Sequence, residues 1–251
     1  MSAKCLNCQT TLQGSYCHHC GQKSSTHRIT FSKFVQHDLI HGIFHLDKGV
    51  LYTLKSLIYS PGYAARTFIQ GKRVMHYNIF ALFIIIIALK TLVDLQIAPG
   101  EVFKSSNAPA QQSDEMINTA IRHYYKFFYL LIIPLLSAFS FTLLRKLRFN
   151  FVEHLVLNAF ILAGGFFYAL VFSLVEYLAN IPELRIYGLL FIGFYILVAY
   201  YQATRGTYGF IAYFWRSLLA LILFVASLLV IFLAIIVVFY GGNFNGMITL
   251  S

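Results

Sequence analysis

The chain has 251 residues, of which 59% are hydrophobic and 11% are charged, and its formal net charge is +10. Soluble domains carry about 25% charged residues, so this composition excludes an ordinary soluble protein and favours one that lies in a lipid bilayer. The basic residues are scattered among segments that flank apolar stretches. They therefore indicate membrane topology and contact with membrane lipids, and no nucleic-acid partner is expected.

Residues 1–24 contain two Cys-x-x-Cys pairs, formed by Cys5, Cys8, Cys17 and Cys20. Four thiolates at this spacing predict a small ribbon around a tetrahedral structural zinc ion. A closed four-sulfur site has no position for a reactive water, so a catalytic metal is not expected. The spacing alone also leaves iron open. His18 and His19 lie inside the second pair, where exposed loop positions are favoured over a role as competing ligands.

Residues 30–71 predict amphipathic helices at the cytoplasmic surface, either interfacial or forming a buried elbow. Val50–Tyr59 is one of these helices, and the next begins at Pro61 and is closed by Gly71.

A histidine stripe, defined as His37, His41 and His45 with Asp38 beside it, lies on the first of these helices. Imidazoles four residues apart share one helix face, so the stripe is a candidate second metal or proton-responsive site. A polar stripe on a surface-lying helix is the favoured alternative.

The rest of the chain predicts an all-α transmembrane bundle over residues 77–240, with about five spans of the length that a bilayer requires. The predicted spans are residues 77–97, 124–144, 152–178, 186–202 and 218–239, and residues 98–123 form an exterior loop. Tyrosines at span ends, such as Tyr200-Tyr201 and Tyr213, are interpreted as interface anchors. The glycine pair at 164–165 and the segment Gly188 to Gly193 predict close helix approach.

Basic residues decide the orientation. They gather before the first span, between the second and third, and between the fourth and fifth, where they are Arg66, Lys72, Arg73, Arg145, Lys146, Arg148, Arg205 and Arg216. The positive-inside rule then places the N-terminus in the cytoplasm and the C-terminus outside. Because the cytoplasm is reducing, this orientation favours a metal site over disulfides at the cysteines.

The N-terminal third contains a series of short motifs: Cys5-Leu-Asn-Cys8, Tyr16-Cys17-His-His-Cys20-Gly21-Gln22, His45-Leu-Asp47-Lys48-Gly49, Tyr52-Thr-Leu-Lys55, Ser60-Pro61-Gly62 and Gly71-Lys72-Arg73. In this order they resemble an uncharacterised bacterial family of multi-pass membrane proteins with an N-terminal zinc ribbon, classed as a domain of unknown function. The resemblance covers roughly the first ninety residues. It implies a bacterial inner-membrane location, a zinc ribbon and a similar multi-span body, and it implies no activity.

Few polar residues fall inside the predicted spans. Lys90 and Asp94 can pair across one helical turn, and Asn158 and Glu176 lie in the third span. Charged and polar groups in a membrane are candidates for function, so these residues would line a polar route if they converged.

Three functions remain open from the sequence. The favoured one is a non-enzymatic assembly, adaptor or regulatory protein whose cytoplasmic zinc ribbon binds a protein partner. The second is a small-solute or ion transporter using Lys90, Asp94, Asn158 and Glu176. The third is a lipid-acting membrane enzyme using the histidine stripe. No phosphate-binding loop, nucleophile elbow or zinc-protease helix is present, so an enzyme is the less favoured class. The sequence does not indicate an oligomeric state.

Overall fold

A computed structural model describes residues 4–26, 28–29, 49–97 and 131–240. Its elements are α2 (Gly49–Tyr59), α3 (Pro61–Ile69), α4 (Ile79–Ile97), η3 (Arg145–Leu147), α6 (Phe151–Ala179), α7 (Leu184–Thr204) and α8 (Phe210–Tyr240). A further apolar helix is described over Leu131–Leu143. In these residues the fold is all-helical, with only isolated β-bridges.

Four of the described helices, α4, α6, α7 and α8, are long and apolar enough to cross a membrane. The predicted span over 124–144 is described only from Leu131, and its helix there is shorter than a full crossing. The predicted exterior loop and the histidine stripe with Asp38 lie outside the described residues. The prediction of about five spans therefore agrees with the structure for four of them.

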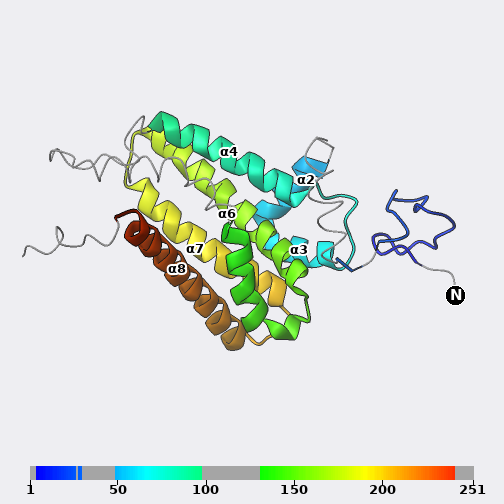
Figure 1. Cartoon of the computed structure of the whole chain (residues 1–251). Coiled ribbons are helices and arrows are strands. Elements are labelled where there is room, and N and C mark those ends of the chain that lie inside the picture. Colours follow the sequence, from blue (N-terminus) through cyan, green and yellow to red (C-terminus); the bar gives the residue numbers. More distant parts are fainter. Residues whose placement is uncertain (1–3, 27, 30–48, 98–130, 241–251) are drawn as a thin grey trace, which may run out of the picture.

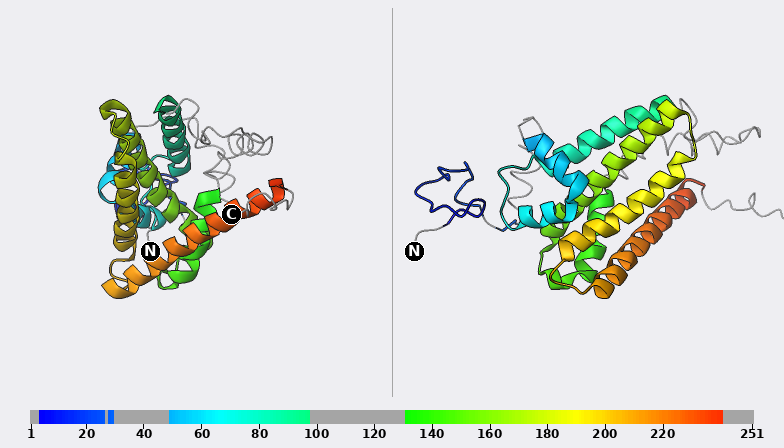
Figure 2. Two further views of the ribbon diagram at one scale, coloured as in Figure 1. Left: turned by 90° about the vertical axis from the view of Figure 1, so that its left-hand side faces the viewer. Right: turned by 180° about the vertical axis from the view of Figure 1, so that it is seen from behind.

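The long helices form a row in which α4 packs on α6, α6 on α7, and α7 on α8. Seen from behind in Figure 2, α8 again lies at the edge of this row. Its apolar side chains are largely exposed, for example Ile211 and Val230, as suits a surface that faces lipid. The central helix is α6, whose first half is almost wholly buried.

The long helices do not all run in the same direction. We call the described residues 4–26 and 28–29 the N-terminal head. In Figure 1, α4, α6 and α8 run away from this head, and α7 runs back toward it. One end of the bundle therefore carries the head, the start of α4, the loop before α6 and the α7–α8 turn. We call this the head end.

Helices α2 and α3 form an elbow that packs against α6 and α7. Pro61 is the first residue of α3, and because proline has no N–H, the chain cannot continue the hydrogen-bonding of α2 through this point. The last carbonyls of α2 need other donors. Tyr195 Oη donates to the Leu57 carbonyl at 2.7 Å, Tyr168 Oη to Ile58 at 3.2 Å, and Gln202 Nε2 to Tyr59 at 3.3 Å.

The position of Tyr195 along α7 shows how far the elbow reaches into the helix bundle from the head end. This residue lies nine positions before the end of α7, which corresponds to about 13 Å along the helix axis. Irregular backbone at such a depth is tolerated only where protein side chains satisfy its polar groups, as they do here. Arg66 in α3 adds a second tie, because its Nη1 donates to the Arg205 carbonyl at 2.6 Å, at the C-terminal end of α7.

Candidate metal centre and its contacts with the bundle

The four cysteines form one cluster. Their sulfur atoms all lie within 4.8 Å of one another, with Cys5 Sγ 3.6 Å from Cys20 Sγ and Cys8 Sγ 3.5 Å from Cys17 Sγ. No disulfide joins them. Tetrahedral coordination with metal–sulfur bonds of about 2.3 Å places the sulfurs about 3.8 Å apart. The donor set and its spacing therefore fit a metal ion that takes four thiolates.

Two nearly identical turns bring the sulfurs together. In the first, Gln9 N donates to the Cys5 carbonyl and Cys5 N to the Thr10 carbonyl, both at 2.9 Å. In the second, Gly21 N donates to the Cys17 carbonyl at 2.9 Å and Cys17 N to the Gln22 carbonyl at 2.8 Å. An antiparallel bridge closes each turn, Lys4 with Thr11 and Tyr16 with Lys23.

Both turns need a residue with positive φ directly after the second cysteine. Gly21 takes this position at φ 74°, and Gln9 takes the equivalent one at φ 65°. Glycine adopts this conformation freely, whereas a residue with a Cβ is strained in it. The first turn thus adopts the same conformation as the second although it has Gln9 where the second has Gly21.

The electrostatics of the cluster also fit a cation. Hydrogen bonds from the side chain and backbone of Thr10 lower the pKa of Cys8 to about 5. Burial, with a smaller contribution from the neighbouring thiols, raises the pKa of Cys20 to about 11. Four sulfurs this close cannot all ionise without a compensating charge, and a bound metal ion would favour the thiolate form of each.

The head contacts the chain between α3 and α4. Leu6, inside the first Cys-x-x-Cys turn, lies against Gly71, where an added Cβ would be 2.7 Å from Leu6 Cδ1. Gly71 also has φ 107°, so two independent constraints favour glycine there. In the second turn, the buried Gln22 accepts a hydrogen bond from Arg73 N at 3.2 Å. Each cysteine turn thus makes one contact with this segment.

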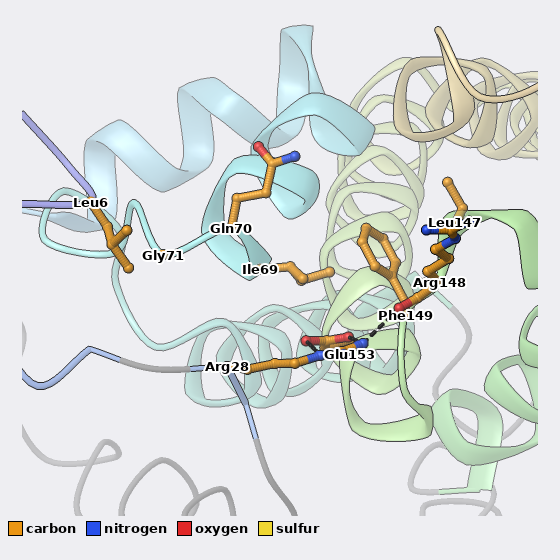
Figure 3. A pocket seen from close by; sticks show the side chains of 9 residues that line it. All are labelled: Leu6, Arg28, Ile69, Gln70, Gly71, Leu147, Arg148, Phe149 and Glu153. Atoms are coloured by element: carbon orange, nitrogen blue, oxygen red, sulfur yellow. Dashed lines mark hydrogen bonds and ion pairs between the residues drawn. The ribbon is translucent and has the colours of Figure 1, made fainter. Parts of the chain in front are cut away.

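An ion pair joins the end of the head to the start of α6 (Figure 3). Arg28 Nε donates to Glu153 Oε1 at 2.8 Å, and Arg28 Nη2 donates to Glu153 Oε2 at 2.9 Å and to the Arg148 carbonyl at 2.6 Å. The hydrogen bonds to Glu153, together with its charge, raise the pKa of Arg28. Glu153 also closes a capping box with Asn150, whose side chain donates to the Ile29 carbonyl.

The predicted intramembrane residues form separate polar groups. Lys90 Nζ lies 2.6 Å from Asp94 Oδ2 and 3.5 Å from Ser173 Oγ on α6. Glu176 pairs with Arg185 at 2.7 Å, across the turn between α6 and α7. Asn158 lies 18 residues before Glu176 on the same helix, or about 27 Å along its axis. The structure brings Lys90 and Asp94 together and keeps Asn158 apart from Glu176.

Asn158 is the centre of a buried hydrogen-bond network between the Leu131–Leu143 helix, α6 and α7. Its Nδ2 donates to Ser137 Oγ at 3.0 Å and Ser140 Oγ at 2.9 Å, and Tyr200 Oη donates to its Oδ1 at 2.6 Å. Ser140 Oγ also lies 2.9 Å from His154 Nδ1. All these side chains are fully buried, so the network fixes how three helices pack.

The interpretation of Tyr200 and Tyr213 as interface anchors was wrong, because both are buried. The buried residues Ile196, Ala199, Tyr200 and Ala203 repeat every three to four positions along one face of α7. That period is the sequence signal of a packed helix face, and it could have identified Tyr200 as a core residue.

Replacing Asn158 by alanine is expected to lower the free energy of unfolding by about 2–3 kcal/mol, because the Tyr200 and serine hydroxyls lose a partner and a small cavity opens. A cycle with Tyr200→Phe should give a coupling of about 0.6–1.7 kcal/mol, the range of hydrogen bonds inside membranes. SDS titration in mixed micelles, followed by circular dichroism, measures both.

The matched control for this variant is Ser227→Ala in α8, whose hydroxyl donates to the Phe224 carbonyl of its own helix. It should change stability little. An Asn158→Ala protein as stable as this control would contradict the network.

Comparison with known families gives one match. A family model described as "Protein of unknown function (DUF3667)" matches residues 47–89, which include α2, α3 and the first half of α4. Neither curated proteins nor solved structures match the chain. The resemblance to a family of unknown function is thus supported for the elbow and the first half of α4. The cysteine-containing segment lies outside this match, and a bacterial origin stays a prediction.

Proposed function

We propose that the protein is a non-enzymatic assembly, adaptor or regulatory protein of the bacterial inner membrane, with a zinc-binding head that docks a protein partner in the cytoplasm. The observation that carries this proposal is the cluster of four sulfurs within 4.8 Å, held by two matching turns. Zinc is the metal most often bound by four thiolates in a tetrahedral structural site, and such a site leaves no coordination position for substrate.

The charge distribution supports a cytoplasmic head. Basic side chains of the described residues gather at the head end, on the α3–α4 segment, around η3 and on the α7–α8 turn. At the opposite end, the described start of α7 carries Arg185, which is paired with Glu176. By the positive-inside rule, the head end faces the cytoplasm.

The head also offers a surface for a partner. Tyr16, which precedes the second cysteine pair, is 62% exposed, and His18 and His19 are exposed beside it. Exposed tyrosines are enriched where proteins bind one another, because one side chain offers apolar area and a hydroxyl. Metal binding would hold this surface in one conformation while the contacts of Leu6 and Gln22 fix it to the bundle.

Photo-crosslinking in cells tests the proposal. A photoreactive amino acid at Tyr16 is expected to give an adduct of one reproducible mass that contains a second protein. The same amino acid at Tyr187, which is 63% exposed at the start of α7, is the matched control and should not give that adduct. The adduct should also disappear when Cys17 and Cys20 are serine. Adducts that are identical at both tyrosines, or that survive loss of the cysteines, would contradict docking through a metal-stabilised head.

A further inference from the structure

A cavity of about 330 Å³ lies where the head meets the bundle (Figure 3). Its apolar lining comes from three parts of the chain: Leu6 from the head, Ile69 from the end of α3, and Leu147 and Phe149 from the segment before α6. Because that segment precedes the first turn of α6, the cavity lies at the level where the membrane helices begin. It is open to the outside and does not belong to the cysteine cluster.

Two arginines also line the cavity, Arg28 and Arg148. Arg28 uses Nε and Nη2 to bind Glu153 and the Arg148 carbonyl, so the N–H groups of its Nη1 remain available within the described structure. The Arg148 side chain is exposed and has no partner among the described residues. Glu153, the acidic residue of the lining, is already neutralised by Arg28. The cavity therefore presents uncompensated positive charge.

The surroundings increase this charge. Lys72 and Arg73 follow Gly71 on one side of the cavity, and Arg145 and Lys146 precede Leu147 on the other. In the described part of the head end, Glu153 is the only acidic side chain. A basic recess between membrane helices at a cytoplasmic face attracts anionic phospholipid headgroups.

We propose that this cavity binds the phosphate headgroup of an anionic phospholipid, with Arg148 and the free edge of Arg28 as its hydrogen-bond donors. Arginine binds phosphate oxygens with paired N–H groups, which gives these contacts both strength and orientation. Leu6, Ile69 and Phe149 provide apolar contact for the glycerol and the first acyl carbons. A free phosphate ion would gain nothing from those walls, so the lining favours a lipid.

Native mass spectrometry of the full-length protein in detergent, titrated with phosphatidylglycerol or with phosphatidylcholine of the same acyl chains, tests the site. Wild-type protein is expected to bind one phosphatidylglycerol more tightly than any further one, and more tightly than phosphatidylcholine. Arg148→Gln keeps a long polar side chain and leaves the Arg28–Glu153 pair in place. It should weaken that first binding step about fivefold, the effect of one basic residue at a lipid surface.

Arg145→Gln is the matched control, because Arg145 is an exposed arginine on the same segment and does not line the cavity. It removes the same charge without removing a donor that lines the cavity, so it should weaken the first binding step clearly less than Arg148→Gln does. Equal binding of the two lipids by the wild type would overturn the proposal, and so would an unchanged Arg148→Gln protein or an equal loss in Arg145→Gln. Displacement of phosphatidylglycerol by low millimolar inorganic phosphate would also overturn it, since the site would then take free phosphate.

Discussion

Protein in which serine replaces Cys17 and Cys20 is expected to contain no zinc after purification, whereas the wild type should contain about one ion per chain, as a four-thiolate site does. Two thiolates cannot complete tetrahedral coordination, and a serine hydroxyl is not deprotonated at neutral pH. Structural zinc contributes about 10–16 kcal/mol to the folding of isolated zinc-binding peptides, so the head should lose its structure with its metal. Elemental analysis of the purified protein measures the metal content directly.

The spans should remain helical in this variant, because their hydrogen bonds are internal and their solvent is lipid. Circular dichroism should therefore change little. Limited proteolysis should show faster cleavage after Lys72 and Arg73, since Gln22 and Leu6 would no longer contact this segment.

His18→Ala with His19→Ala is the matched control for the cysteine variant. Both histidines lie between Cys17 and Cys20 and are exposed, so their loss should leave the zinc content at about one ion. A wild-type protein without metal, or a histidine variant that loses it, would contradict a site formed by the four cysteines. If elemental analysis finds iron in place of zinc, the four-cysteine site stands and only the identity of its metal changes.

The sequence predicts the long helices well because hydropathy reports burial in lipid, which is their main determinant. The predicted spans at 77–97, 152–178 and 186–202 differ from α4, α6 and α7 by at most two residues at each end. The predicted start of the last span, Leu218, is eight residues later than the start of α8 at Phe210. Hydropathy locates the apolar stretch, whereas the helix also includes the aromatic and basic turn before it.

The contacts that place the head were not predictable from the sequence. The cysteines are recognised by local spacing, but Gln22 meets Arg73 at a separation of 51 residues and Arg28 meets Glu153 at 125. Nothing in the pattern around Arg28 distinguishes it from other basic residues near the membrane. Asn158 was identified as polar within a span, yet its partner Tyr200 comes from another helix. Such pairs depend on how helices pack, which a single sequence does not show.

The glycines also show that a local sequence pattern predicts helix contacts only in part, because the contacts depend on how the helices pack. The predicted close approach at 164–165 is present at Gly164, where an added Cβ would lie 1.7 Å from Tyr195 Oη. At Gly188 it would meet Phe172 at 3.0 Å, and at Gly193 it would meet nothing within 4 Å. Among the described glycines, the closest backbone approach is at Gly62, which the sequence analysis noted only as part of the Ser60-Pro61-Gly62 motif.

Gly62→Ala is expected to lower the free energy of unfolding by about 3 kcal/mol, the upper range for overpacking a filled site. A Cβ at this position would lie 1.8 Å from the Ala199 carbonyl oxygen and 2.7 Å from Ala203 N, which are backbone atoms of α7. Backbone cannot rotate away as a side chain can, so α3 must separate from α7. That shift would also break the hydrogen bond from Gly62 N to Gln202 Oε1.

Gly193→Ala in α7 is the matched control, because its added Cβ would meet nothing within 4 Å. Alanine is favoured over glycine inside a helix by about 0.5–1 kcal/mol, so this variant should be slightly more stable than the wild type. SDS titration in mixed micelles gives both values. Equal stability of the two variants would show that α3 does not pack on α7 at this register. A large loss confined to Gly62→Ala would instead show that the elbow, which lies within the family match, is fixed by direct backbone contact with the bundle.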